Sequence, residues 1–401
     1  MKIIVQKFGG TSVKDEQTRL RALSHIKKAL QEGYKVVVVV SAMGRKGDPY
    51  ATDTLQSLVN VSKMSNREQD LLLSCGETIS SIVFSNMLNV NGITAIALTG
   101  AQAGFHTNDE HTNAKIVEMN CQRVEEELTS HDVVVVTGFQ GVSRNGEVTT
   151  LGRGGSDTSA AALGVALQAE FIDIYTDVEG VMTADPRIVE GARPLSFITY
   201  NEICNLAHQG AKVIHPRAVE IAMQAKVPLR VRSTYSDGPG TLVTSVVENN
   251  KGSYIHDRVV TGIAHVPNVT QITVTAGEGH YNIQSEVFKA MAQEGISVDF
   301  INISPNAIIY TVMDKMTERA ITVLRKIGHE PKVIRNCAKV SAVGAGMTGV
   351  PGVTARIVNA LSKEGIQILQ SADSHTTIWV LVHEKDMVQA VNSLHNEFCL
   401  E

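Results

Sequence analysis

The sequence has few cysteines, and none of them is placed for a structural role. Five cysteines are scattered over 401 residues, and no two of them form a C-x-x-C pair. An odd number of separated cysteines is typical of reduced thiols and argues against a disulfide framework or a zinc site. The thirteen histidines also lack a metal-binding spacing such as H-E-x-x-H. We therefore expect no metal ion to be held by side chains of the protein alone.

Aromatic residues, an excess of basic charge and long apolar runs are missing as well. Aromatic residues make up 4% of the chain and the formal net charge is -5, which leaves no basic, base-stacking surface for nucleic acid. No window holds the uninterrupted apolar run of about 18 residues or more that a membrane helix needs. The N-terminal "MKIIVQKFGG" enters a predicted strand without the pattern of a signal peptide. We predict a soluble, cytoplasmic protein that binds neither nucleic acid nor membrane.

Hydrophobic residues, at 43%, are abundant enough for large cores, and the length predicts two or three domains. Residues 1–245 alternate helical patterns with near-continuous apolar strands. The predicted strands cover residues 2–8, 35–43, 93–100, 132–139, 171–177 and 227–233. Such runs indicate a sheet covered on both faces. We predict an α/β domain, a three-layer αβα sandwich with a mostly parallel sheet, and ligands at the carboxyl ends of its strands.

The first predicted helix lies between residues 17 and 35. Leu20, Leu23, Ile26 and Leu30 follow helical spacing, and Gly33 ends the pattern.

The composition turns polar over residues 235–257, where we place a domain boundary. Beyond it, two segments share one order of elements. The first has predicted strands at 270–276, 297–304, 308–314 and 332–336, with helices at 284–295 and 317–328, and forms a βαββαβ unit. The second has strands at 338–346, 367–373 and 377–386, with helices at 353–365 and 387–398, and lacks its last strand.

An edge of that second unit must be filled, and residues 259–266 form a strand-like segment without a partner in the first unit. We predict a domain at 1–245, a linker at 246–258, a first βαββαβ unit at 267–337, and a second unit made of 259–266 and 338–401. The first unit is then inserted in the second.

The stretch "KFGGTS", residues 7–12, offers phosphate-binding chemistry without being a Walker A loop. Gly9 and Gly10 lack side chains that would block close approach of the backbone to a phosphate. Lys7 would supply a mobile cation to the transferring group. A plain tight turn is the alternative.

A second stretch, "GRGGSD", precedes an alanine-rich helix. We expect Ser156 or Asp157 to be the N-cap of that helix, which makes its start an anion-accepting terminus. Arg153 adds a planar fork suited to a carboxylate or phosphate, and Asp157 could receive an ammonium group. The alternative is an ordinary capped helix with a solvated arginine.

A third stretch, "IYTDVEGVMTADPR", carries Asp177 and Asp185 around a strand end and a glycine turn. An α/β sheet commonly holds a nucleotide at such a place, although acidic loop residues are often only solvated turns. Three more polar residues do not indicate a site when taken one at a time: Glu77 near a helix, Ser41 at a strand end and Thr52 in the following loop.

Together, "KFGGTS", "SAMG", "GRGGSDTSA", "TDVEGVMTADPR" and "GAKVIHPRA" resemble the aspartokinases over essentially the whole chain. The resemblance implies an amino acid kinase fold followed by two ferredoxin-like ACT domains. It also implies ATP-dependent phosphorylation of the L-aspartate side-chain carboxylate, the first step of lysine, threonine and methionine biosynthesis. ATP, Mg²⁺ bound through nucleotide phosphates and a homodimer joined through the ACT domains are implied with it.

The resemblance also assigns residues. Lys7, Arg153 and Asp157 are the implied catalytic residues. The implied aspartate-binding residues are Ser41, Thr52, Glu77, Arg153, Ser156 and Asp157. The implied nucleotide-binding residues are Lys7, Phe8, Gly9, Gly10, Thr176, Asp177, Asp185, Arg187, Lys212 and Val213.

The regulatory half departs from the family pattern. Aspartokinases that sense lysine or threonine commonly carry an Asp/Pro/Gly-type loop and a Gln-Asn pair, where this chain has "AGEGHYNIQSE" and "FINIS". The chain is most similar to the diaminopimelate-sensitive type. Glu278, Gln284, Asp299 and Asn302 are the candidate effector contacts, with ordinary surface polarity as the alternative.

Three other functions stay open at this point. Another amino-acid-kinase-fold enzyme would share the sandwich and the glycine loops, but "KFGGTS" with "GRGGSDTS" and paired ACT units favours the aspartokinases. A non-catalytic amino-acid sensor could keep this architecture without needing Lys7, Arg153 and Asp157 together. A structural interaction protein would leave the phosphate-type loops without a role.

Overall fold

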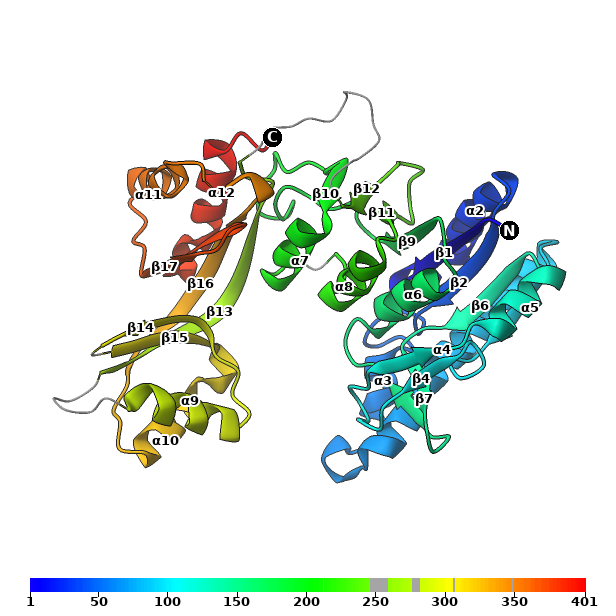
Figure 1. The fold of residues 1–401 in the computed structure, drawn as a ribbon, viewed down its shortest axis with the longest axis horizontal. Coiled ribbons are helices and arrows are strands. Elements are labelled where there is room, and N and C mark those ends of the chain that lie inside the picture. Colours follow the sequence, from blue (N-terminus) through cyan, green and yellow to red (C-terminus); the bar gives the residue numbers. More distant parts are fainter. Residues whose placement is uncertain (212, 246–258, 276–281, 306, 348) are drawn as a thin grey trace. The chain divides into compact units, whose positions relative to one another are not determined.

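The computed structural model describes residues 1–211, 213–245, 259–275, 282–305, 307–347 and 349–401 (Figure 1). The chain forms two compact units. The first consists of Met1–Met182, Pro194–Ala207 and Lys212–Tyr254, and the second of Thr183–Arg193, His208–Ala211 and Ile255–Glu401. The predicted linker at 246–258 lies outside the described residues.

An eight-stranded sheet forms the centre of the first unit. In sheet order its strands are β10 (Phe197–Thr199), β12 (Thr241–Thr244), β11 (Leu229–Ser233), β9 (Phe171–Thr176), β1 (Ile3–Phe8), β2 (Lys35–Val40), β6 (Val133–Thr137) and β3 (Ala95–Leu98). Neighbouring strands are parallel except β11 and β12. The mostly parallel α/β sheet predicted from the apolar runs is therefore confirmed.

Helices cover both faces of this sheet. The helices up to residue 245 are α1 (Gly10–Val13), α2 (Glu16–Gln31), α3 (Thr52–Ser57), η1 (Val61–Lys63), α4 (Asn66–Val90), α5 (Gln122–Ser130), α6 (Gly155–Ala166), α7 (Tyr200–His208) and α8 (Pro216–Ala225). Helices α2 and α4 share one core with β1, β2 and β6. Helix α6 packs on the opposite face, where a Cβ on Gly164 would lie 2.3 Å from Ile172 of β9. The glycine permits this close helix–sheet contact, and the three-layer arrangement is confirmed.

Helix α2 shows how local sequence sets an element. Asp15 and Thr18 form a capping box at its start, and Gly33 takes a φ of +87° just past its end. Leu20 follows the helical spacing but is 45% exposed. Ala22 and Ala29 complete the buried stripe with Leu23 and Ile26 instead, because small side chains allow the helix to approach the sheet.

Helix α4 is long and apolar enough to span a membrane by length and composition, but half of its most apolar window is buried inside the protein. Its Phe84 and Leu88 belong to the core that α4 shares with α2. Core helices of globular domains pass the same test, and the burial favours that interpretation.

A small four-stranded sheet was not predicted. Its order is β5 (Ile116–Met119), β4 (Phe105–Thr107), β7 (Gln140–Ser143) and β8 (Val148–Thr150). These strands have three or four residues each, too few to show alternation in the sequence. Strand β8 leads directly into the "LGRGGSD" stretch, so this sheet supports the candidate site.

The second unit contains one six-stranded sheet. Its order is β14 (Asp299–Ser304), β15 (Ala307–Met313), β13 (Gly262–Thr275), β16 (Lys332–Val343), β18 (Thr377–His383) and β17 (Gln370–Asp373). The sequence predicted separate strands at 259–266 and 270–276, and again at 332–336 and 338–346. Each pair is a single strand. Strand β13 continues through a register shift at Asn268, with a φ of +58°, and β16 continues through another at Asn336, with a φ of +52°.

Two helix pairs pack against this sheet. Helices α9 (Ile283–Gln293) and α10 (Thr317–Lys326) bury one apolar cluster with β13 and β15. Helices α11 (Val353–Lys363) and α12 (Met387–Glu397) bury another with β16 and β18. Residues 262–266 pair antiparallel with 339–343, and 271–273 pair with 332–334. Strand β13 therefore contributes to both halves of the sheet.

Candidate active site

A pocket of about 300 Å³ lies at the carboxyl ends of four neighbouring strands of the first unit. Its lining residues are Thr11, Lys14, Arg45, Asp48, Asp177 and Tyr235, which follow strands β1, β2, β9 and β11. The general rule for parallel α/β sheets places ligands at this edge. The pocket combines two cations with two carboxylates, a polarity suited to a charged ligand rather than an apolar one.

Asp177 is the residue of this pocket that the sequence predicted. Its carboxylate accepts a hydrogen bond from Arg45 at 2.9 Å, and the Thr176 hydroxyl donates to it at 3.2 Å. Lys14, Arg45 and Tyr235 were missed. Arg45 and Tyr235 lie in polar loops without a distinguishing motif, and the signal available for them was their position shortly after a predicted strand. Lys14 is the C-cap of α1, which follows β1.

Lys7 and Asp157 are brought together. Lys7 lies near the carboxyl end of β1 and Asp157 in the first turn of α6, and Nζ of Lys7 is 2.8 Å from Oδ1 of Asp157. Their side chains are only 13% and 12% exposed. The backbone N–H of His215 donates to Oδ2 of Asp157 at 3.1 Å. The pair joins a mobile cation to a fixed carboxylate at the sheet edge.

Gly10 begins α1 where the chain passes close to the loop after β2. A Cβ on Gly10 would lie 2.6 Å from the carbonyl oxygen of Gly44 and 2.7 Å from that of Ala42. Gly9 precedes it as the N-cap of α1. The backbone at these glycines is therefore close to the loop that carries Ser41, a half-buried residue whose N–H donates to the carbonyl of Phe8.

The N-cap prediction for α6 was wrong. The helix begins at Gly155, and its N-cap is Gly154 in the left-handed region with a φ of +69°. A Cβ at Gly154 would lie 2.1 Å from the ring of His215, so only glycine fits there. Ser156 and Asp157 consequently occupy the first turn of the helix. Both are buried, and Ser156 packs against Gly138 at the end of β6.

Arg153 precedes this glycine cap. Its side chain is exposed and makes no ion pair or hydrogen bond within the described part of the chain. An exposed, unpaired guanidinium is available for bidentate contact with a carboxylate or phosphate.

Glu77 is a fully buried carboxyl in the middle of α4. Its Oε1 accepts a hydrogen bond from the N–H of Ala42 at 3.0 Å, directly after Ser41. Its Oε2 has no partner among the described residues. Burial raises the pKa of Glu77 from an ordinary 4.5 to about 8, although the Ala42 N–H acts in the opposite direction. Neighbouring Gly76 has no room for a side chain, since its Cβ would lie 2.8 Å from that of Ala42.

Other predicted residues fall elsewhere. Thr52 is half-buried at the start of α3. The Phe8 ring lies in the core, stacked on Tyr175 at 4.7 Å, so only its backbone can face a ligand. Val213 lies two residues before His215, and Lys212 is outside the described residues.

Asp185 and Arg187 belong to the second unit, where they bind each other. Nε and Nη2 of Arg187 donate to the two oxygens of Asp185 at 3.0 and 2.7 Å. These hydrogen bonds lower the pKa of Asp185. The side chain of Arg187 is 85% exposed.

The candidate effector residues are spread over the second unit. Gln284 lies in the first turn of α9, while Asp299 and Asn302 are exposed residues of β14. Asp299 forms an ion pair with Lys339 of β16. Glu278 is outside the described residues.

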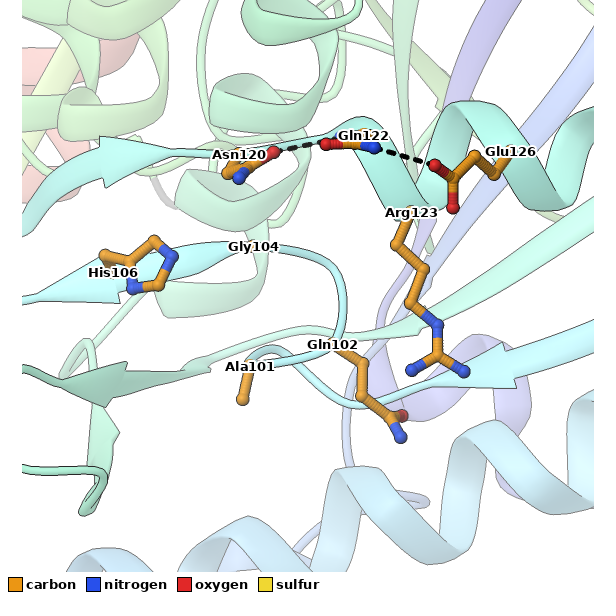
Figure 2. Close-up of a pocket in the computed structure, with 8 residues that line it drawn as sticks. All are labelled: Ala101, Gln102, Gly104, His106, Asn120, Gln122, Arg123 and Glu126. Atoms are coloured by element: carbon orange, nitrogen blue, oxygen red, sulfur yellow. Dashed lines mark hydrogen bonds between the residues drawn. The ribbon is translucent and has the colours of Figure 1, made fainter.

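A second pocket, of about 220 Å³, contains none of the predicted residues (Figure 2). It is lined by Ala101, Gln102, Gly104, His106, Asn120, Gln122, Arg123 and Glu126. The side-chain amide of Gln122 donates a hydrogen bond to the Glu126 carboxylate at 2.8 Å, so these two polar groups already have each other as partners.

Comparison with known proteins decides the family. Residues 2–233 match the model of the amino acid kinase family, and residues 332–396 match a model of the ACT domain. The chain is 69% identical over 400 residues to Aspartokinase 1 of Bacillus subtilis (strain 168), with 99% of each chain covered. The chain belongs to the aspartokinase family.

Other aspartokinases are similar over their full length. The aspartokinase of Geobacillus stearothermophilus is 42% identical over 411 residues, covering 100% of this chain and 98% of its own. The crystal structure of E. coli aspartokinase III in complex with aspartate and ADP has a TM-score of 0.79 at 26% identity, with 99% of each chain covered. The same E. coli enzyme in complex with lysine and aspartate has a TM-score of 0.77.

Proposed function

We propose that this protein transfers the γ-phosphoryl group of ATP to the side-chain carboxylate of L-aspartate, forming 4-phospho-L-aspartate. The observation that carries the proposal is the Lys7–Asp157 pair at 2.8 Å, at the same sheet edge as a charged pocket of about 300 Å³. Membership of the aspartokinase family supports aspartate as the acceptor.

The reaction needs no general base, because an aspartate carboxylate is already ionised at neutral pH. The protein must hold two anions in line and reduce their repulsion. Lys7 stabilises negative charge on the transferring group, and the backbone at Gly9 and Gly10 allows phosphate oxygens to approach. Lys14 and Arg45 add positive charge in the pocket.

Aspartate is held by groups that match its charges. Arg153 binds a carboxylate of the substrate through its guanidinium fork. Glu77 and Asp157 receive the ammonium group, and the unpartnered Oε2 of Glu77 supports this assignment. Ser41, Thr52 and Ser156 contribute smaller polar contacts. Thr176, Asp177, Asp185, Arg187, Lys212, Val213 and the backbone of Phe8 complete the nucleotide site.

Mg²⁺ would be bound together with the nucleotide. The described residues contain no group of three His, Cys, Asp or Glu side chains that could hold a metal ion. The proposed ligands of Mg²⁺ are phosphate oxygens of the nucleotide and water. When bound, Mg²⁺ neutralises charge on the phosphates.

We further propose domain boundaries and a regulatory role. Residues 1–245 form the kinase domain, 246–258 the linker, 267–337 the first ACT domain, and 259–266 with 338–401 the second. Pairing of 262–266 with 339–343 supports this division. The ACT domains bind an amino-acid end product, with meso-diaminopimelate favoured by the departures at 276–286 and 300–304, and they join two copies into a cytoplasmic homodimer.

The test is ADP formation from ATP in the presence of L-aspartate, with L-glutamate as the alternative acceptor. Lysine, threonine and meso-diaminopimelate are each added in parallel. We expect activity with aspartate but not with glutamate, and inhibition of that activity by meso-diaminopimelate. Activity with glutamate would assign the chain to another kinase, and inhibition by lysine or threonine alone would replace the proposed effector.

A further inference from the structure

A buried carboxylate outside the described pockets connects three segments of the first unit. Asp70, in α4, is 0% exposed. It accepts hydrogen bonds from the Thr150 hydroxyl at 2.5 Å and from the N–H of Thr112 at 3.0 Å to both oxygens. Nδ1 of His111 lies 2.8 Å from its Oδ2. None of these residues was assigned a role above, and an acidic residue with this many protein partners is fixed in place.

Asp70 stabilises the backbone of Thr112 in a conformation that threonine disfavours. Thr112 has a φ of +72°, in the left-handed region that β-branched residues rarely adopt. Such a residue persists only where its surroundings hold it, and it commonly lies beside a functional site. The two hydrogen bonds from the Thr112 N–H to Asp70 supply this restraint.

The Thr112 segment lies against the loop that presents Arg153. The Ala114 N–H donates to the carbonyl of Thr150 at 2.8 Å. A Cβ on Gly152 would lie 2.9 Å from Oδ1 of Asn113 and 3.2 Å from the carbonyl of Thr112, so the two loops are in close contact. Thr150 ends β8, three residues before Arg153.

A second restraint acts on the same two loops. Arg217 donates to the carbonyl of Leu151 and to that of Ala114, each at 3.1 Å. Asp70 and Arg217 therefore join the 112–114 and 150–152 segments at two points, and Arg153 emerges immediately after them.

We propose that Asp70 is a positioning residue for aspartate binding: it fixes Thr112 and Thr150, and through them the loop that aims Arg153 at the substrate carboxylate. This rests on the proposed function, which assigns that contact to Arg153. Within the described part of the chain, Asp70 has no hydrogen bond or ion pair with the residues that line the 300 Å³ pocket, so its effect falls on aspartate rather than on ATP.

The test compares KM values in the full-length protein. Asp70→Asn keeps the size of the side chain but replaces one acceptor oxygen with a donor. We expect it to raise the KM for aspartate by about 10-fold, in keeping with hydrogen bonds to a charged group, while the KM for ATP stays within about twofold. Thr150→Val removes one donor and should raise the same KM less, whereas Thr150→Ser keeps the hydroxyl and is the matched control.

A rescue separates positioning from general damage. Glycine adopts positive φ readily, so Thr112→Gly in the Asp70→Asn background should bring the aspartate KM back towards the wild-type value. Because the same change also relieves backbone strain in the fold, the aspartate KM of the folded variants, and not their thermal midpoint, separates positioning from a purely structural role.

Several outcomes would overturn the inference. These are an unchanged aspartate KM in folded Asp70→Asn and Thr150→Val, an equal rise in both KM values, or a double variant no better than the single one. If the wild-type protein does not use aspartate, the proposed function fails and the inference fails with it. Wild-type activity with an unresponsive aspartate KM overturns the inference alone.

Discussion

Replacing Glu77 by glutamine should stabilise the protein while weakening its binding of aspartate. The wild-type carboxyl is fully buried, its Oε2 has no partner among the described residues, and its pKa is raised to about 8. Burial penalises the charged form, so the free protein keeps this carboxyl neutral until the pH approaches the raised pKa. Glutamine imitates the neutral form at every pH.

The sign and size of the effect follow from proton linkage. Between pH 4.5 and about 8 the folded protein holds a proton on Glu77 that the unfolded chain has lost. The contribution of Glu77 to the free energy of unfolding is therefore fully present below pH 4.5. It is lost as the pH rises towards 8, by ~1.4 kcal/mol per pH unit. The free energy of unfolding of the wild-type protein falls by up to about 5 kcal/mol over this window, as an order of magnitude, and that of Glu77→Gln does not.

The assay measures the thermal midpoint of ligand-free protein between pH 5.5 and 8.5, together with the KM for aspartate. Glu118→Gln, at an exposed position of β5, makes the same charge change as a control. We expect Glu77→Gln to become more stable than wild type as the pH rises. We expect its KM for aspartate to increase by roughly 10- to 100-fold, because glutamine cannot form the charged hydrogen bond that an ionised Glu77 makes with the bound ammonium group. Parallel stability curves for the two proteins would refute the raised pKa, and an unchanged KM would refute the contact with the ammonium group.

Three further changes test the site. Lys7→Ala should lower kcat by about 10²–10³-fold, because it removes charge stabilisation at the transferring group, and should also lower stability, because the mostly buried Asp157 loses its partner; near-normal turnover would contradict the role in transfer. Arg153→Ala should mainly raise the KM for aspartate, measured by steady-state kinetics, and an unaltered KM would count against the guanidinium contact. Gly10→Ala should reduce both stability and activity, since its Cβ would lie 2.6 Å from the carbonyl oxygen of Gly44; a fully active, equally stable variant would show that the loops can separate without cost.

The main sheet could be predicted because its strands are almost uniformly apolar. Strand β2, for example, contains five consecutive valines and is buried on both faces. The small sheet of β4, β5, β7 and β8 could not, since strands of three or four residues carry no periodic signal. The merging of predicted strands into β13 and β16 was also missed, because residues such as Asn268 and Asn336 suggest turns and yet occur within or beside continuous pairing.

The site was predictable where glycine loops follow strands. Lys7 and Asp157, which form an ion pair, and Asp177, which lines the pocket, were singled out in this way. Glu77 came only from the family resemblance, because an acidic residue in a helix is ordinarily exposed. Asp70 was missed for the same reason. Its partners Thr112 and Thr150 lie 42 and 80 residues away in the sequence, and such contacts exist only once the chain has folded.

The most direct test of the central claim is to trap the product. The protein is incubated with ATP, Mg²⁺ and L-aspartate in the presence of hydroxylamine, which converts an acyl phosphate to a hydroxamate that can be identified by mass and by comparison with the authentic side-chain hydroxamate. The proposed function predicts the β-hydroxamate of aspartate, dependent on ATP and nearly absent with Lys7→Ala. Absence of any aspartate hydroxamate from folded wild-type protein, or formation of a glutamate hydroxamate instead, would contradict it.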